Sequence, residues 1–177
     1  MKPFLATLGV AALLSACSMS PMMTKVDNAS LPEAVRVPAG QRMKMASTGV
    51  GMLTYECREK TAAAGQFEWA FVSPVATLYA ADKRTVGKYY AGPTWESSDG
   101  SKITGKQVAI SPAAPGNIPL QLVKTDPAMG AGSMMGVTYI QRVNTKGGVA
   151  PATMCDPAAK GQRQQVSYEA DYVFYGS

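Results

Sequence analysis

The sequence predicts an all-β fold: a single sandwich or barrel-like domain of about seven to nine short, mostly antiparallel strands with little helix. Apolar and polar residues alternate over several runs, most clearly at residues 165–175. Clusters of glycine, proline, asparagine and aspartate separate these runs, as turns do. Helical periodicity is poor, and residues 61–64 suffice for one turn at most.

The expected strands follow one another with regular turn signals between them. They cover residues 50–58, 67–72, 77–81, 85–91, 102–110, 119–124, 137–144 and 165–175. The turn signals include residues 99–101, 115–117, 130–136 and 147–148. In the last strand one face carries Val166, Tyr168, Ala170, Tyr172 and Phe174. The strict alternation there predicts that this face lies against the core.

The N-terminus has the layout of a secretory signal peptide. Lys2 gives a positive start, and residues 4–14 are apolar but too short to span a bilayer, which takes ~20 residues. Leu14-Ser15-Ala16 then precede Cys17, which resembles the lipobox of bacterial lipoproteins. That resemblance implies removal of residues 1–16 and acylation of Cys17. The alternative is an ordinary signal peptide in which Cys17 is incidental.

Two consequences follow for location and domain organisation. Ser18 stands where aspartate is the usual retention signal for the inner membrane, which favours an outer-membrane anchor facing the periplasm. Residues 17–30 have no strand or helix period and are expected to be a flexible tether. Residues 31–177 are then a single β-rich domain.

Composition excludes some partners and cofactors. The formal net charge is +5, and the basic residues are scattered rather than clustered with aromatic residues, so nucleic acid is not an expected partner. The chain has no histidine, which removes triads built on it and His-rich metal sites, and no metal is expected. The glycine-rich residues 130–136 do not fit the dinucleotide fingerprint, and no cofactor is expected.

The cysteines fit an oxidising compartment. With Cys17 assigned to lipid, Cys57 and Cys155 remain, and an even number in a secreted protein predicts a disulfide. Two buried thiols or half a metal site are the alternatives.

Several ordered segments resemble a known family. They are residues 55–57, 67–69, 92–96, 99–101 and 140–143, and later Gly147-Gly148, Cys155 and residues 172–175. In this order they are similar to the domain-of-unknown-function family numbered 3455, which includes secreted and lipoprotein-like bacterial proteins and secreted fungal ones. The resemblance covers about residues 31–175. It implies a fold neighbourhood and no established activity. Relatives often have a histidine near position 89, where this chain has Tyr89.

The best candidate ligand site is the segment at residues 89–99. It brings together aromatic rings and carboxylates around a Gly-Pro bend, a combination that suits a sugar or a cation: Tyr89, Tyr90, Trp95, Glu96 and Asp99. The alternative is structural, with Trp95 in the core and Asp99 in a hairpin turn.

These features favour an envelope lipoprotein that binds a small ligand or envelope carbohydrate without catalysis. One alternative is a histidine-free hydrolase of envelope carbohydrate that uses Glu96 or Asp99. Another is copper binding through methionines, since thioether clusters suit Cu(I) and the chain has 11 methionines.

The first prediction concerns Cys17. Cys17→Ser should move the protein from the membrane fraction to the soluble periplasm, or leave it unprocessed, because the acylated residue is lost. Fractionation and mass spectrometry of the mature N-terminus test this. An unmodified mature N-terminus at another residue would contradict it.

Overall fold

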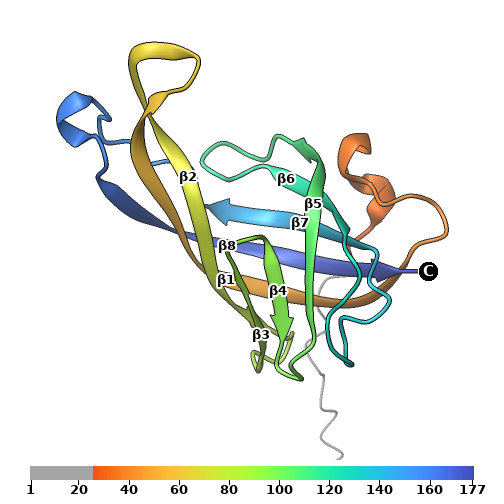
Figure 1. Cartoon of the computed structure of the whole chain (residues 1–177). Helices are drawn as coiled ribbons and strands as arrows, with labels where there is room; N and C mark the ends of the chain where they lie inside the picture. The colour runs from red at the N-terminus through yellow and green to blue at the C-terminus, as the bar shows by residue number, and fades with distance from the viewer. Residues whose placement is uncertain (1–25) are drawn as a thin grey trace, which may run out of the picture.

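The described residues, 26–177 of a computed structural model, form a closed antiparallel barrel in which each strand pairs with the next and β8 pairs with β1 (Figure 1). The strands are β1 (Arg42–Lys60), β2 (Ala63–Tyr79), β3 (Thr85–Tyr90), β4 (Thr94–Ser97), β5 (Lys102–Ser111), β6 (Leu120–Thr125), β7 (Tyr139–Gly147) and β8 (Arg163–Gly176). The predicted all-β class is confirmed. Of the two predicted architectures, the chain adopts the barrel.

Closure depends on β1, which pairs with β2 from Thr48 to Lys60 and with β8 over its earlier part. Its register with β8 runs from Arg42 opposite Gly176 to Glu56 opposite Arg163. Beyond the barrel the β1–β2 hairpin continues outward, as the yellow loop in Figure 1 shows. The barrel has no unpaired first or last strand, because β8 completes the ring.

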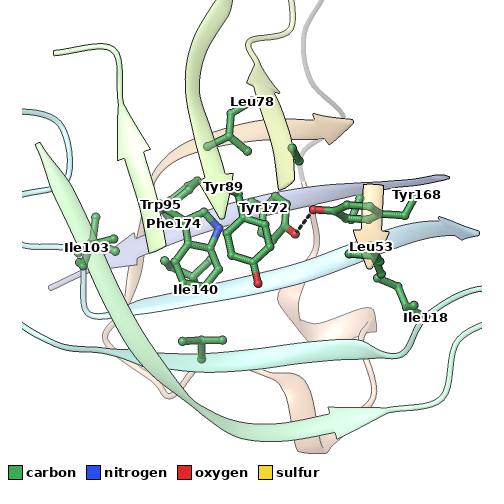
Figure 2. Packing of buried hydrophobic residues seen from close by; sticks show 14 of the residues in the cluster. Leu53, Leu78, Tyr89, Trp95, Ile103, Ile118, Ile140, Tyr168, Tyr172 and Phe174 are labelled. Carbon is green, nitrogen blue, oxygen red and sulfur yellow. Dashed lines mark hydrogen bonds between the residues drawn. The ribbon is translucent and has the colours of Figure 1, made fainter. Parts of the chain in front are cut away.

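The barrel interior is packed with aromatic and aliphatic side chains (Figure 2). Trp95 and Tyr172 are fully buried, and Tyr89 stacks on Trp95 with ring centroids 4.7 Å apart. Tyr172 also contacts both rings. Gly49 makes room for this cluster, since a Cβ there would lie 2.6 Å from Cε2 of Tyr172. We call Tyr89, Trp95 and Tyr172 the aromatic plug.

The period-two prediction for the last strand is confirmed. The side chains of Tyr168, Ala170, Tyr172 and Phe174 all belong to the interior cluster, and Val166 packs against it. The residues of β8 that alternate with these, such as Val173, point to the other side of the sheet and belong to a second cluster.

That second cluster lies on the outer face of β6, β7 and β8, beneath the N-terminal segment. Two 3-10 turns, η1 (Asn28–Ser30) and η2 (Glu33–Val35), lead into it, and Val35 is fully buried. Gln141 of β7 donates to the side chain of Asn28 and to the carbonyl of Val35. Residues 26–30, which the sequence placed in the tether, are therefore packed on the barrel.

Strand boundaries differ from expectation in several places. The expected strands at 67–72 and 77–81 are one continuous strand, β2, which runs through Pro74. β4 was not predicted, because its four residues are too few to show an alternating pattern. The strands β1, β2 and β8 are also longer than the short strands expected.

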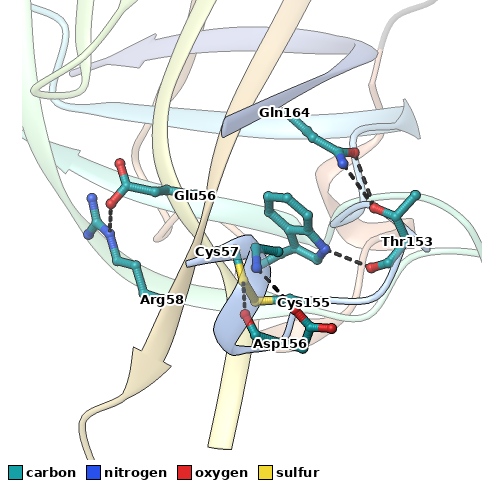
Figure 3. The surroundings of a disulfide bond; sticks show 9 residues. Glu56, Cys57, Arg58, Thr153, Cys155, Asp156 and Gln164 are labelled. Carbon is teal, nitrogen blue, oxygen red and sulfur yellow. Dashed lines mark hydrogen bonds and ion pairs between the residues drawn. A yellow bond between two sulfur atoms is a disulfide. The ribbon is translucent and has the colours of Figure 1, made fainter. Parts of the chain in front are cut away.

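The disulfide between Cys57 and Cys155 is present, with Cα atoms 5.5 Å apart (Figure 3). It fastens the loop after β7 to the outward end of the β1–β2 hairpin. Cys57 also exchanges backbone hydrogen bonds with this loop, and Trp69 donates from Nε1 to the Thr153 carbonyl at 2.8 Å.

Residues 1–25 lie outside the described residues, and with them the predicted signal peptide, Cys17 and most of the predicted tether. Among residues 26–177 no helix is long and apolar enough to cross a membrane.

We expect loss of the disulfide to destabilise the domain strongly. The bond joins residues 98 apart in sequence. Chain-entropy arithmetic for a loop of this length gives about 4–5 kcal/mol. Urea unfolding of the double variant Cys57→Ala/Cys155→Ala should show this loss. Reductant should shift the parent protein similarly and the double variant not at all; an unchanged midpoint in the reduced parent would contradict the prediction.

Trp95→Ala should lower the free energy of unfolding by about 3–5 kcal/mol, since it opens a cavity between Tyr89 and Tyr172. Tyr90→Phe, which removes a hydroxyl on the outer face of the same hairpin, serves as the control and should cost far less. A loss below about 1 kcal/mol for Trp95→Ala would show that the plug does not hold the barrel together.

Candidate functional site

The β3–β4 hairpin separates the candidate residues by the alternation of its strands. Tyr89 and Trp95 form one cross-strand pair, and both side chains point into the barrel. Tyr90 and Glu96 belong to the neighbouring positions and lie on the outer side. The burial of the Tyr89 ring raises the pKa of its hydroxyl to about 12, so it stays protonated at neutral pH.

On the outer face Glu96 is held by its neighbours. The hydroxyl of Tyr90 donates to its carboxylate at 2.7 Å, and the ammonium groups of Lys88 and Lys102 lie 3.2 and 3.3 Å away. These contacts, the Tyr90 hydrogen bond foremost, keep the pKa of Glu96 below its ordinary value. A general acid needs a raised pKa, so this carboxylate is poorly suited to that role.

Asp99 lies in the turn between β4 and β5 and ties that turn to the loop between β6 and β7. It accepts hydrogen bonds from the backbone and hydroxyl of Ser101 and from the backbone of Ser133. The Ser101 hydroxyl bond is the largest cause that holds the pKa of Asp99 well below its usual range. The Asp99 carboxylate therefore holds two loops together through these hydrogen bonds.

The structure thus distributes the five candidate residues over three places: the barrel interior, the outer face of β3–β4, and the β4–β5 turn. Only Asp99 of the five lines the largest of the pockets described below. The signal that separates them was present in the sequence, since residues 89 and 90 must face opposite sides of a strand.

The largest of these pockets, about 480 Å³, lies at the barrel end where β1 begins. Residues from β1, β2, β3 and β8 line it together with the turn after β4 and the loop before β7, and we call it the loop-end pocket. Its apolar wall consists of Met45, Leu78, Val86, Met134 and Phe174.

Polar side chains also line the pocket, among them Ser97, Asp99 and Arg84. Ser47 is 3% exposed, and its hydroxyl has no hydrogen-bond partner among the described residues. A mostly apolar concavity with few polar groups is the usual form of a small-molecule site. Sequence reasoning missed Ser47, because nothing local distinguishes it from other strand serines.

A smaller pocket of about 240 Å³ lies toward the other end of the barrel, above the short β3–β4 hairpin. β3 pairs with β2 only as far as Val75, and β4 pairs with β5 only as far as Thr104. The upper parts of β2 and β5 therefore have no strand between them, as Figure 1 shows. Residues of both strands line the pocket at this place, and we call it the window pocket.

Among residues 26–177 no group of three His, Cys, Asp or Glu side chains could hold a metal ion. Among the described methionines, Met45 and Met134 line the loop-end pocket, whereas Met43 and Met135 are about half exposed.

Comparison with known proteins supports the resemblance seen in the sequence. The family described as "Protein of unknown function (DUF3455)" matches residues 38–176, which includes every strand of the barrel. No curated protein and no solved structure matches the chain. Because the match covers most of its length, the chain belongs to the DUF3455 family.

Proposed function

We propose that this protein is a lipid-anchored binding protein on the periplasmic face of the outer membrane, and that it holds a small apolar ligand in the loop-end pocket. The observation that carries the proposal is the apolar wall of that pocket, formed by Met45, Leu78, Val86, Met134 and Phe174. Apolar surface that a ligand removes from water contributes about 25 cal/mol per Å² to binding. The ligand is therefore a small apolar molecule.

The position of the chain's N-terminal part agrees with this. Val26 lies beside Met43 and Tyr175, at the same barrel end as the loop-end pocket. Cys17 precedes Val26 by nine residues, which span at most about 30 Å when fully extended. If Cys17 carries lipid, the pocket is confined close to the membrane surface, where apolar ligands are concentrated.

Binding is favoured over catalysis by the state of the carboxylates. The negative charge of Glu96 is balanced by Lys88 and Lys102 on the outer face, outside the lining of both pockets, and Asp99 holds two loops together. The hydrolase alternative needs two carboxylates about 5–10 Å apart across a substrate, one with a raised pKa. Both carboxylates named for that role have lowered pKa values instead.

The test is binding of N-phenyl-1-naphthylamine, a neutral apolar amine whose fluorescence rises in apolar surroundings, to the mature chain in detergent-free buffer. We expect saturable binding. Ala80→Trp, which places a large ring in the wall of the pocket, should reduce the affinity at least tenfold.

The matched control is Ala91→Trp, an exposed turn position at the opposite end of β3 from Ala80. It should bind the probe as the parent does. The absence of saturable binding, or equal binding by the Ala80→Trp protein, would contradict the proposal.

A further inference from the structure

The window pocket contains a cation that the proposed function does not use. Arg142 is on β7, two residues after Ile140, whose side chain lies in the interior cluster. Residues two apart in a strand point to the same side of the sheet. Its register partners are Gln121 on β6 and Tyr172 on β8. Arg142 therefore projects toward the inside of the barrel and lines the window pocket.

The charge of Arg142 is not compensated by an acidic side chain. None of the ion pairs among residues 26–177 includes it. The window pocket has no carboxylate in its lining. An arginine that faces the inside of a barrel without an acidic partner is unusual, because desolvation of an unpaired charge is costly.

The hydrogen bonds of Arg142 leave part of its guanidinium available. Nε and Nη2 both donate to the carbonyl of Pro119, at 3.2 and 2.9 Å. A guanidinium has five N–H groups, so the outer edge formed by Nη1 and Nη2 keeps donors that no described residue accepts. Two parallel N–H groups on one edge match the two oxygens of a carboxylate.

Other donors lie around the same pocket. Tyr89 lines it, and its hydroxyl makes no hydrogen bond with a described residue, whereas Tyr55 already donates to Gly148. Burial raises the pKa of the Tyr89 hydroxyl to about 12, so this group offers a proton to an anion at neutral pH. The amide of Gln121 stands opposite Arg142 on the neighbouring strand, and its Nε2 already donates to Oε1 of Gln107 at 2.7 Å.

The exposed rim of the window pocket lies across the barrel from Arg142. In a ring of eight strands, β7 lies across the barrel from β3, above which the window opens. The rim is apolar: Phe71 and Ile110 are 53% and 49% exposed, and Phe71 packs edge-on against Tyr55. A molecule that enters with its charged end first reaches the cation and leaves its apolar body at the rim.

From this geometry we propose that the window pocket is a second binding site, which takes a small organic monocarboxylate, with the carboxylate on Arg142 and the apolar or aromatic tail between Phe71 and Ile110. A single cation matches a single negative charge. The volume of about 240 Å³ restricts the ligand to a small one. This site is separate from the loop-end pocket, so either can exist without the other.

The experiment is calorimetric titration of the mature chain with benzoate, with benzamide as the neutral analogue of the same shape and phenyl phosphate as the dianion. Benzoate should bind at least tenfold more tightly than either. Arg142→Gln should abolish benzoate binding, and Arg142→Lys should weaken it, because lysine keeps the charge and loses the two-pronged geometry. The exposed Arg42→Gln is the matched control and should bind as the parent does.

A second variant guards against simple loss of folding at Arg142. Gln121→Glu places a carboxylate opposite Arg142 and leaves the guanidinium and its Pro119 bonds in place. Its own carboxylate should occupy Arg142 and eliminate benzoate binding. Neutral Gln121→Met should retain most of it.

The inference is overturned if benzoate does not bind, if benzamide or phenyl phosphate binds as tightly, or if Gln121→Glu binds benzoate like the parent. Naphthylamine binding in the loop-end pocket should be the same in Gln121→Glu as in the parent. Failure of the window site is thereby distinguished from failure of the proposed function.

Discussion

The pairing of β8 with β1 is the constraint on which the remaining structure depends. It turns a meander of antiparallel strands into a ring and gives every inward-facing residue a neighbour across the barrel. Gly49 on β1 and Tyr172 on β8 meet through this closure, and the absent side chain of one makes space for the ring of the other. The aromatic plug then fills the middle of the barrel, which leaves space only toward its ends.

The position of the plug explains why the two pockets are distinct. Leu78 and Phe174 line the loop-end pocket on one side of it, while Leu53 and Ile118 line the window pocket on the other. Each end has its own chemistry because different loops and strands reach it. The loop-end pocket combines an apolar wall with hydroxyls, the fixed Asp99 and Arg84, which is paired with Asp82, whereas the window pocket contains tyrosines, amides and the unpaired Arg142. A filled barrel can thus offer two small sites in place of one large central cavity.

Much of the fold could be predicted from local patterns. The alternation at residues 165–175 identified the inner face of β8, and the two cysteines left after Cys17 identified the disulfide. The continuity of β2 could not be predicted, because a proline such as Pro74 usually interrupts a strand. Beyond Val75 this strand has no β3 partner, so the proline removes no hydrogen bond on that side.

The candidate site could be predicted only in part from the sequence. Tyr89, Trp95 and Asp99 were noticed for their chemistry, yet their directions depend on strand alternation and on the loop before β7. Arg142 became significant only through closure, which brings it to residues far away in sequence.

Amide chemical-shift mapping of the mature chain, with naphthylamine and benzoate added singly and together, tests whether the filled barrel separates two independent sites. Two separate sets of resonances should shift, one around Ser47 and Met134 and one around Gln121 and Arg142. The shifts from the two ligands should add when both are present. A single shared set, or displacement of one ligand by the other, would contradict this separation.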